Sequence, residues 1–363
     1  MKISLYPFAR RAAVLTVAAF GGAAMLAGGP ASAKTIKLTV VGGPPVIVTP
    51  VAIAKKVVLP AIDKALAASG KDLKIEWKQA YGQSLAKFTE VLETVEEGIA
   101  HVGILLRNFE EAKLPLEAYA TVMPFGIWDA KTHMEVEAIL RAKVPEMDKT
   151  YHKYNQVYLT SGPSSSMQMF TTFPITKYDD LKNRKMGASG ALGQLLRGTG
   201  ATVVTASMAQ SYTDIKNGLY DGYPIHIGLA FPYQTYKAAK FYSEINFGTN
   251  AIPGMSVNKK TWDGFPAFLR KIFRDAMAKY GPAYAKMDAG KVKKFAGIMK
   301  KKGVKFSKFS ETERKRWAMA MPNLAKEWIA RLEPKGLPAG KIVKVYMNEV
   351  RRVNPKVIRH WDR

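Results

Sequence analysis

The chain has 363 residues, of which 47% are hydrophobic, so its length and composition are typical of about two domains with sizeable cores. It contains no cysteine, which excludes disulfide bonds and thiolate metal sites. The formal net charge is +26, and the three cationic and no acidic residues of positions 1–33 leave +23 for the remainder. Such a charge indicates either attraction to an anionic ligand or membrane surface, or simply a solvated cationic surface. The second interpretation is favoured, because the lysines stand among apolar residues in helical patterns, as in 293–302.

The N-terminus has the three parts of a secretory signal peptide. Lys2, Arg10 and Arg11 form a positive segment, Ala12–Gly29 is apolar, and Ala31–Ala33 is an A-x-A cleavage site. A membrane anchor is the alternative, but this run is short and rich in glycine and alanine. Cleavage after the final alanine, by the general or the twin-arginine route, predicts a periplasmic protein that meets no nucleic acid.

Residues 34 to about 125 are predicted to form one α/β unit. Three alternating or apolar segments are expected as strands: Thr35–Val41, Leu73–Trp77 and His101–Leu106. Two periodic segments between them are expected as helices: Thr49–Ser69 and Ala86–Glu97. Alternation of strands and helices with short loops is typical of a parallel sheet.

The middle of the chain is where a crossing between two lobes is expected. An aromatic loop at 123–129 precedes predicted helices over Ala130–Ala142 and Val144–Lys153. A strand over Gln156–Gly162 then leads into Ser164–Thr172, which is polar on one side and rich in Met and Phe on the other.

A second sheet is predicted from 178–222. Lys185–Ala188 and Ala201–Thr205 are expected as strands, a helix starts near Ala191, and another covers Met208–Asn217. Because open parallel sheets bind ligands at the carboxyl ends of their strands, the turn Gly187–Gly190 is a candidate binding edge.

The last third is predicted to be mainly helical. Helices are expected over Phe231–Ala239, Pro266–Lys279, Ala283–Lys302, Glu311–Arg331 and Lys341–Arg352, with an interruption at Gly281-Pro282. Strands are expected over Tyr242–Phe247, Gly254–Val257 and Val304–Phe309.

No catalytic constellation has suitable spacing. The five histidines include no H-x₃-H pair, and the chain has no H-E-x-x-H or G-x-S-x-G motif. Ser189 stands in a glycine turn without a recognisable base, and the glycines of 190–198 fit neither phosphate-binding pattern. We therefore expect a binding protein rather than an enzyme, with no cofactor and no metal.

The segment Met208–Gly222 (MAQSYTDIKNGLYDG) resembles the signature P-x-E-V-Y-x-A-L-Q-x-G-x-V-D-G of the DctP-type solute-binding proteins of TRAP transporters. Tyr212, Gly218 and Asp221-Gly222 match, while Gln210 replaces the glutamate. Further motifs match in order along nearly the whole mature chain: Gly82-Gln83, Pro124-Phe125, Asp180–Lys182, Lys185-Met186, Tyr236–Phe241 and Asn258–Trp262.

The resemblance implies an α/β, two-lobed, periplasmic-binding-protein-like fold. Each lobe would be a mainly parallel sheet flanked by helices, with a long helix from the C-terminal half spanning both lobes. The approximate division is 34–157 plus 247–282 for lobe I, and 158–246 plus 283–363 for lobe II. A monomer of this kind would close on a small organic solute, an organic acid or aromatic compound, and deliver it to a membrane permease.

Three polar positions of the family differ in this chain. The arginine that ends the D-L-K-G-x-K-I/M-R motif and pairs with a ligand carboxylate is Gly187, the asparagine of D-G-x-E-N is Ile225, and the arginine after P-F is Trp128. One interpretation is that these positions have lost their binding role by sequence drift, or that the alignment is slightly shifted. The other is that the pocket is adapted to a bulkier, less polar solute, with Gly187 opening space for it. Arg107, then His226, is the expected replacement cation if the solute is an anion.

The full set of predicted ligand-binding residues is Tyr81, Gln83, Arg107, Trp128, Met167, Met169, Phe170, Gly187, Ser189, Tyr212, Tyr223, Ile225, His226 and Phe231. Each aromatic residue taken alone is also consistent with a place in the core. A secreted sensory or scaffolding protein with the same fold is the alternative function, and an extracytoplasmic enzyme is a weaker third.

Overall fold

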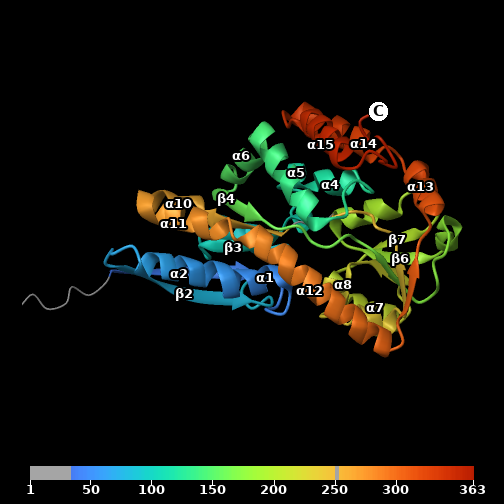
Figure 1. Ribbon diagram of the computed structural model, residues 1–363, viewed down its shortest axis with the longest axis horizontal. Helices are drawn as coiled ribbons and strands as arrows, with labels where there is room; N and C mark the ends of the chain where they lie inside the picture. The colour runs from blue at the N-terminus through green and yellow to red at the C-terminus, as the bar shows by residue number, and fades with distance from the viewer. Residues whose placement is uncertain (1–33, 250–252) are drawn as a thin grey trace, which may run out of the picture.

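The computed structural model describes residues 34–249 and 253–363, so the expected signal peptide lies outside the described residues. Figure 1 shows an elongated molecule in which a blue N-terminal layer and a yellow-green layer lie at opposite ends, joined along one side by an orange helix. The α/β class and the two-lobed arrangement are thereby confirmed.

The first lobe is built on a five-stranded sheet in the order β2-β1-β3-β10-β4. Its strands are β1 (Lys34–Gly42), β2 (Leu73–Tyr81), β3 (Val102–Leu106), β4 (Gln156–Ser161) and β10 (Pro253–Asn258). β1 pairs in parallel with β2 and β3, whereas β10 runs antiparallel to both β3 and β4. The sheet is mixed because β10 returns from the other lobe and enters between two strands of the outgoing chain.

The first long helical segment follows β1 and contains a local π turn. It consists of α1 (Thr49–Ile53), the π segment η1 (Ala54–Val58) and α2 (Leu59–Ala67). Pro60 lacks a backbone N–H and its ring would crowd the carbonyl four residues earlier, which accounts for the widened turn just before it. Val51, Val58 and Ile62 are fully buried against the sheet.

The second lobe holds a four-stranded sheet in the order β11-β9-β5-β8 and a parallel pair, β6-β7. The strands are β5 (Met169–Thr171), β6 (Lys185–Ala188), β7 (Thr202–Thr205), β8 (Gly222–Pro224), β9 (Phe241–Glu244) and β11 (Lys305–Lys308). β5 runs antiparallel to β8 and β9, and a hydrogen bond from the Asp221 amide to the Lys185 carbonyl (2.7 Å) links the β6-β7 pair to the start of β8.

Helices cover the sheets and form an additional core beside them. The remaining α-helices are α3 (Val91–Glu96), α4 (Tyr119–Val122), α5 (Ala130–Lys143), α6 (Glu146–His152), α7 (Ser211–Lys216), α8 (Ile227–Ala230), α9 (Thr235–Ala238), α10 (Lys259–Gly264), α11 (Ala267–Met277), α12 (Tyr280–Lys301), α13 (Glu311–Ala320), α14 (Leu324–Leu332) and α15 (Ala339–Val353). The 3₁₀ segments are η2 (Arg107–Phe109), η3 (Pro115–Ala118), η4 (Tyr178–Leu181), η5 (Gly190–Leu196), η6 (Met208–Gln210) and η7 (Glu333–Lys335). The largest core joins α4, α5 and β6 to α13–α15 around Trp317 and Trp328.

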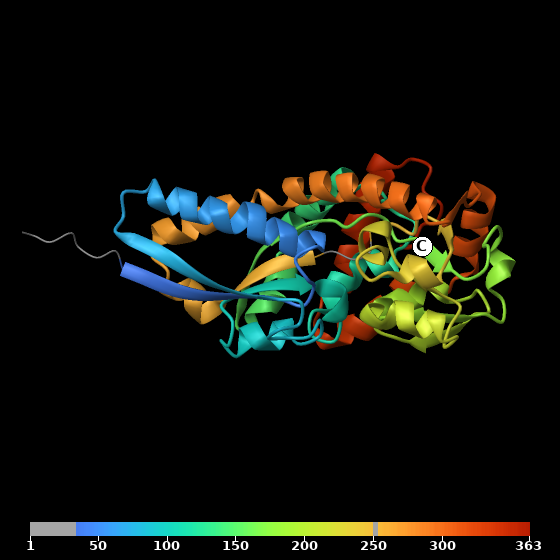
Figure 2. The ribbon, with the colours of Figure 1, turned by 90° about the horizontal axis from the view of Figure 1, so that it is seen from below.

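The 22-residue helix α12 is the element that joins the lobes on one side. It packs on α1 and β4 of the first lobe and on α8 of the second. Figures 1 and 2 both show it running from the first lobe across to the second. The expected long helix spanning both lobes is confirmed. It begins at Tyr280, before Pro282, because proline is tolerated in the first turn of a helix.

Several predicted element bounds were wrong. The helix expected over 86–97 is only α3, and the one over 311–331 is divided into α13 and α14 because Pro322 cannot continue it. The helix expected from 191 is the tighter η5, and 231–239 contains only the short α9. β4 also continues to Ser161, so the chain leaves the first sheet after the predicted boundary at 157.

Within the described ranges, no helix combines the length and apolar character that crossing a membrane requires.

Candidate functional site

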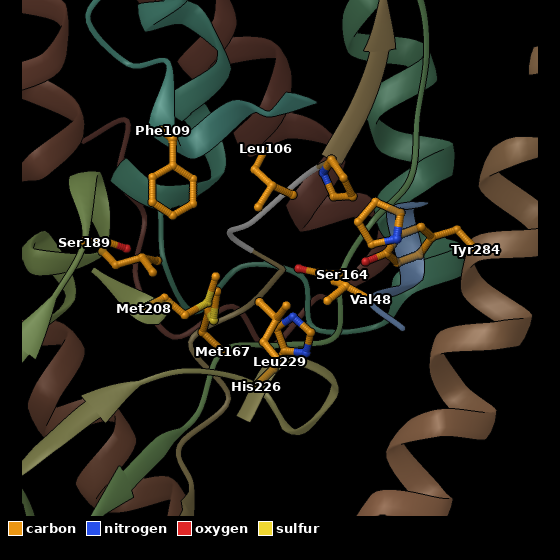
Figure 3. A pocket seen from close by; sticks show the side chains of 13 residues that line it. Val48, Leu106, Phe109, Ser164, Met167, Ser189, Met208, His226, Leu229 and Tyr284 are labelled. Carbon is orange, nitrogen blue, oxygen red and sulfur yellow. The ribbon is translucent and has the colours of Figure 1, made fainter. Parts of the chain in front are cut away.

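A small cavity lies where the two lobes meet, with a volume of about 20 Å³. Figure 3 shows side chains converging on it from β3 and η2 of one lobe, and from the ends of β6 and β8 of the other. It is lined by Val48, Pro50, Leu106, Phe109, Ser164, Met167, Ser189, Leu192, Met208, His226, Leu229, Pro253 and Tyr284. This volume is room for about one water molecule, so an organic solute can enter only when the lobes separate.

The described lining has few polar side chains, and none of them is a Lys, Arg, Asp or Glu. Among the described residues, the buried Ser164 Oγ, Ser189 Oγ and His226 Nδ1 have no hydrogen-bond partner. Ser189 also neighbours the Tyr223 phenol, whose pKa is raised by burial and whose hydroxyl donates to the Ala206 carbonyl (3.0 Å) rather than to Ser189. Buried polar atoms usually have partners, so three orphaned ones around one cavity indicate groups that a ligand would satisfy.

His226 is fixed at the start of α8. Its carbonyl accepts the amides of Leu229 and Ala230, at 3.0 and 2.9 Å, which holds the residue as the N-terminal cap of the short helix. Burial lowers the pKa of the imidazole, and Asp288 opposes that shift only in part. The side chain is therefore a neutral imidazole near pH 7, able to donate one hydrogen bond and accept another.

Asp288 is a buried carboxylate at the middle of α12 that sequence reasoning missed. It accepts hydrogen bonds from the Ser165 amide (3.1 Å), the Ser165 hydroxyl and the Thr49 hydroxyl (3.3 Å). A Cβ added at Gly228 would lie 3.0 Å from both Asp288 and His226, so a glycine at that position allows the close approach of α8 to α12. The signal that could have identified Asp288 is its being the sole acidic residue in a lysine-rich helix.

Of the predicted site residues, the structure brings Met167, Ser189 and His226 together around the cavity. Leu106, Phe109, Ser164, Leu192, Met208 and Tyr284 also line it but were not predicted. They come from five separate segments, and no local motif distinguishes them from ordinary core residues.

Arg107 does not line this cavity. Its guanidinium is 1% exposed and pairs with Glu117 and with Glu137 (2.9 Å), while Arg141 joins the same two carboxylates. Burial by itself would raise the pKa of Glu137, but Arg107 and Arg141 lower it to about 2. This arginine is thus part of a buried network in which two arginines neutralise two glutamates. Its position does not support its expected role as the cation that faces a solute.

Gly187 does not open the pocket as expected. A Cβ at this position would lie 2.5 Å from Cζ of Tyr220, so the phenol ring fills the space that a longer side chain would take. The Tyr220 hydroxyl donates to Asp214 (3.1 Å), which holds the ring in place. The expectation of added room was wrong, because the sequence gives no information on which neighbour lies over a glycine.

The other predicted residues lie in the core or on the surface. Met169, Phe170, Tyr223 and Ile225 are fully buried in hydrophobic clusters, and Phe231 stacks on Phe295 with a centroid distance of 4.1 Å. Trp128 is 46% exposed, with Arg314 over its ring, and Gln83 is exposed in a turn with φ of 67°. Tyr81 and Tyr212 are half-buried. None of these residues lines the inter-lobe cavity.

Two α/β lobes that meet over a small cavity, bridged by a long helix, define an extracytoplasmic-type solute-binding protein. The family model for bacterial extracellular solute-binding protein, family 7, the DctP family, matches residues 72–331. The chain belongs to this family, so the family resemblance read from the sequence is confirmed.

Solved structures of TRAP solute-binding proteins share the fold. A Desulfovibrio salexigens protein with bound orotic acid has a TM-score of 0.76 at 16% identity over 87% of this chain and 99% of its own. A second protein from that organism, an open complex, has a TM-score of 0.74 at 19% identity over 88% and 97%. A Bordetella pertussis receptor binding pyroglutamic acid has a TM-score of 0.72 at 18% identity over 86% and 99%. No curated protein matches the chain.

Proposed function

We propose that this protein is the solute receptor of a TRAP transporter, which captures a small organic solute between its lobes and delivers it to a membrane permease. The observation that carries the proposal is the set of orphaned polar atoms, Ser164 Oγ, Ser189 Oγ and His226 Nδ1, around an inter-lobe cavity. Family membership supports solute binding, and the signal-peptide pattern of residues 1–33 supports a periplasmic location.

Of the two solute classes that the sequence left open, the lining favours an aromatic or otherwise apolar compound over a simple organic acid. The described lining is made of Val, Pro, Leu, Phe, Met and Tyr around the two serines and the neutral His226, without a Lys or Arg. Arg107, the nearest expected cation, already has two carboxylate partners. A carboxylate held there would be a buried charge without a counter-charge, which costs several kcal/mol.

Closure of the lobes accounts for the small size of the cavity. A bound solute would separate the apolar walls contributed by Phe109 and Leu106 of one lobe from those of Met208 and Leu229 of the other. Hinged binding proteins that close around their ligands exclude water from the polar contacts in this way. The crossing segments 162–168 and 245–249 are the expected hinges.

The test is a thermal-shift series on the mature chain. Orotate, pyroglutamate, galacturonate, benzoate and phenylacetate, each with its neutral amide or ester, would be compared for their effect on Tm. Binding to the native state raises stability by about 2.7 kcal/mol at a hundred times Kd. We expect a shift with at least one neutral aromatic member, and a series with no shift would contradict the proposal.

A matched pair of histidine variants assigns the site. His226→Leu should weaken binding of the active compound about tenfold or more, as the loss of one buried hydrogen bond implies. His152→Leu, at an exposed position on α6, should leave the affinity unchanged. Equal affinities of the two variants would place the solute elsewhere.

A further inference from the structure

One side of the molecule carries a row of lysines that have no acidic partner among the described residues. Lys279, Lys286, Lys293 and Lys300 recur every seven residues along α12 and its first flanking residue, and all four are exposed. At 1.5 Å per residue the row is about 30 Å long. We call these four residues the α12 lysine row; a seven-residue spacing places them close to one line along the helix.

The row lacks the ion pairs that neutralise lysines elsewhere. In the described chain, Lys259 and Lys271 pair with Asp263 and Asp275 at 2.5 and 2.7 Å, whereas no carboxylate lies within 4 Å of the α12 lysine row. Asp288, the acidic residue of α12, is buried and faces the junction of the lobes, so it does not neutralise the row.

The neighbouring segment η1–α2 extends the same positive surface. Lys56, Lys64 and Lys279 line an open hollow of about 550 Å³ together with the apolar residues Val57, Pro60 and Ala61. Helix α12 packs on α1 and η1, whereas α2 packs on α11, and Lys279 at the start of α12 is where the row meets this hollow. Lys56 also lies close enough to Lys291 to contribute to the lowered pKa of that ammonium, behind burial as the larger cause.

We infer that this face, the α12 lysine row with the hollow beside it, is a docking surface for an anionic phospholipid bilayer. Lysine is depleted from the centre of protein interfaces, where arginine and aromatic residues are enriched. Over its described residues, the exposed face of α12 carries no arginine or aromatic residue of this kind; it presents lysines and the small residues Ala289, Gly290 and Gly297. Clustered lysines attract anionic headgroups by charge, without specific geometry.

Such contact would keep the receptor on the membrane surface that holds its permease, and it depends on no property of the solute cavity. Because many single ammonium groups contribute, binding should be reversible and sensitive to salt. Solute binding and membrane binding can therefore fail independently in the experiments.

The test is sedimentation of the mature chain with vesicles of phosphatidylglycerol and phosphatidylcholine, against vesicles of phosphatidylcholine alone. We expect binding to the anionic vesicles only, with release by 0.5 M salt. Lys279→Gln, Lys286→Gln, Lys293→Gln and Lys300→Gln combined should reduce partitioning at least about tenfold, since each lysine contributes to surface attraction.

A charge-matched control separates the face from net charge. The combination Lys315→Gln, Lys326→Gln, Lys335→Gln and Lys344→Gln removes four exposed lysines from the α13–α15 side and should keep most of the binding. Equal loss in both variants, or no binding of the parent chain to anionic vesicles, would overturn the inference. Circular dichroism of both variants confirms that each remains folded.

Discussion

Gly187 and Tyr220 form a packed pair in which the glycine accepts the phenol ring rather than a ligand. The ring is 1% exposed, and its hydroxyl donates to Asp214. The role of this glycine is thus one of close packing between β6 and the segment before β8.

This packing predicts a stability effect at Gly187. Gly187→Ala should lower the free energy of unfolding by about 1–3 kcal/mol, because the added methyl group overpacks the contact with Tyr220. Gly264→Ala, where no atom lies within 4 Å of the added Cβ, is the matched control and should be nearly neutral. Urea unfolding measures both variants. If the two variants are equally stable, the Tyr220 ring can shift away from the added methyl group at little cost.

His133 is a second residue whose chemistry depends on its surroundings. It is fully buried on α5, next to the Tyr119 hydroxyl (3.0 Å) and the Thr249 hydroxyl. Burial lowers its pKa to about 4. The folded state therefore holds a neutral ring where the unfolded chain would be protonated below its ordinary pKa of about 6.5.

The sign of the pH dependence follows from that difference. Stability from His133 is complete above about pH 6.5 and is lost as the pH falls toward 4, by about 3 kcal/mol in total. Urea unfolding between pH 7 and 4 should show a shallower loss for His133→Gln than for the parent chain. His152→Gln, on the surface, should follow the parent; a His133→Gln profile parallel to both would contradict the assignment.

At the scale of elements, buried ion pairs join η2, η3 and α5. Arg107, Glu117, Glu137 and Arg141 are all below 10% exposed and pair with one another, and the Arg141 guanidinium lies 3.9 Å from the centre of the Tyr158 ring. Two cations and two carboxylates compensate each other, so the group behaves as a unit that holds α5 to the end of β3.

Breaking this unit should be costly. Arg107→Gln should destabilise the fold by about 3–5 kcal/mol, because it leaves buried carboxylates without their partner. Lys143→Gln removes an exposed lysine from Glu349 (3.2 Å), which keeps Arg352 as a second partner, and should cost no more than about 1 kcal/mol. Chemical unfolding distinguishes the two, and a neutral Arg107→Gln with loss of solute binding would restore the ligand role for this arginine.

At the scale of the whole molecule, α12 joins the lobes through Asp288. The carboxylate holds the crossing residue Ser165 and Thr49 of α1, while the same helix packs on α8. Both lobes therefore contact one rigid element, and the crossing segment is positioned by a charge-assisted hydrogen bond.

Asp288→Asn should weaken the contact between α12 and the crossing segment. We expect a loss of about 1–3 kcal/mol in stability, as for a buried hydrogen-bonded group, with faster amide hydrogen exchange in 162–168. Asp275→Asn, at an exposed pair on α11, is the control. Unchanged exchange in the crossing segment would show that Asp288 does not restrain it.

The fold class and most strands could be predicted from the sequence because hydrophobic periodicity and turn residues act locally, and the family could be predicted from its motifs. The sequence also indicated the exported location through residues 1–33, which remains a prediction. Ser189 and His226 were found because they stand beside family motifs at strand ends, and Met167 because it lies in the Met- and Phe-rich crossing segment.

The residues that share the cavity could be identified only in the folded chain. Arg107 and Gly187 look like pocket residues in the sequence, but one meets two buried glutamates and the other meets Tyr220. Ser164 and Leu192 carry no local signal, and although Asp288 stands out as the one acid of a lysine-rich helix, that pattern does not show that it meets Ser165 and Thr49. Burial, pairing and the exposure of the α12 lysine row are properties of packed neighbours, and a linear pattern does not specify which neighbours those are.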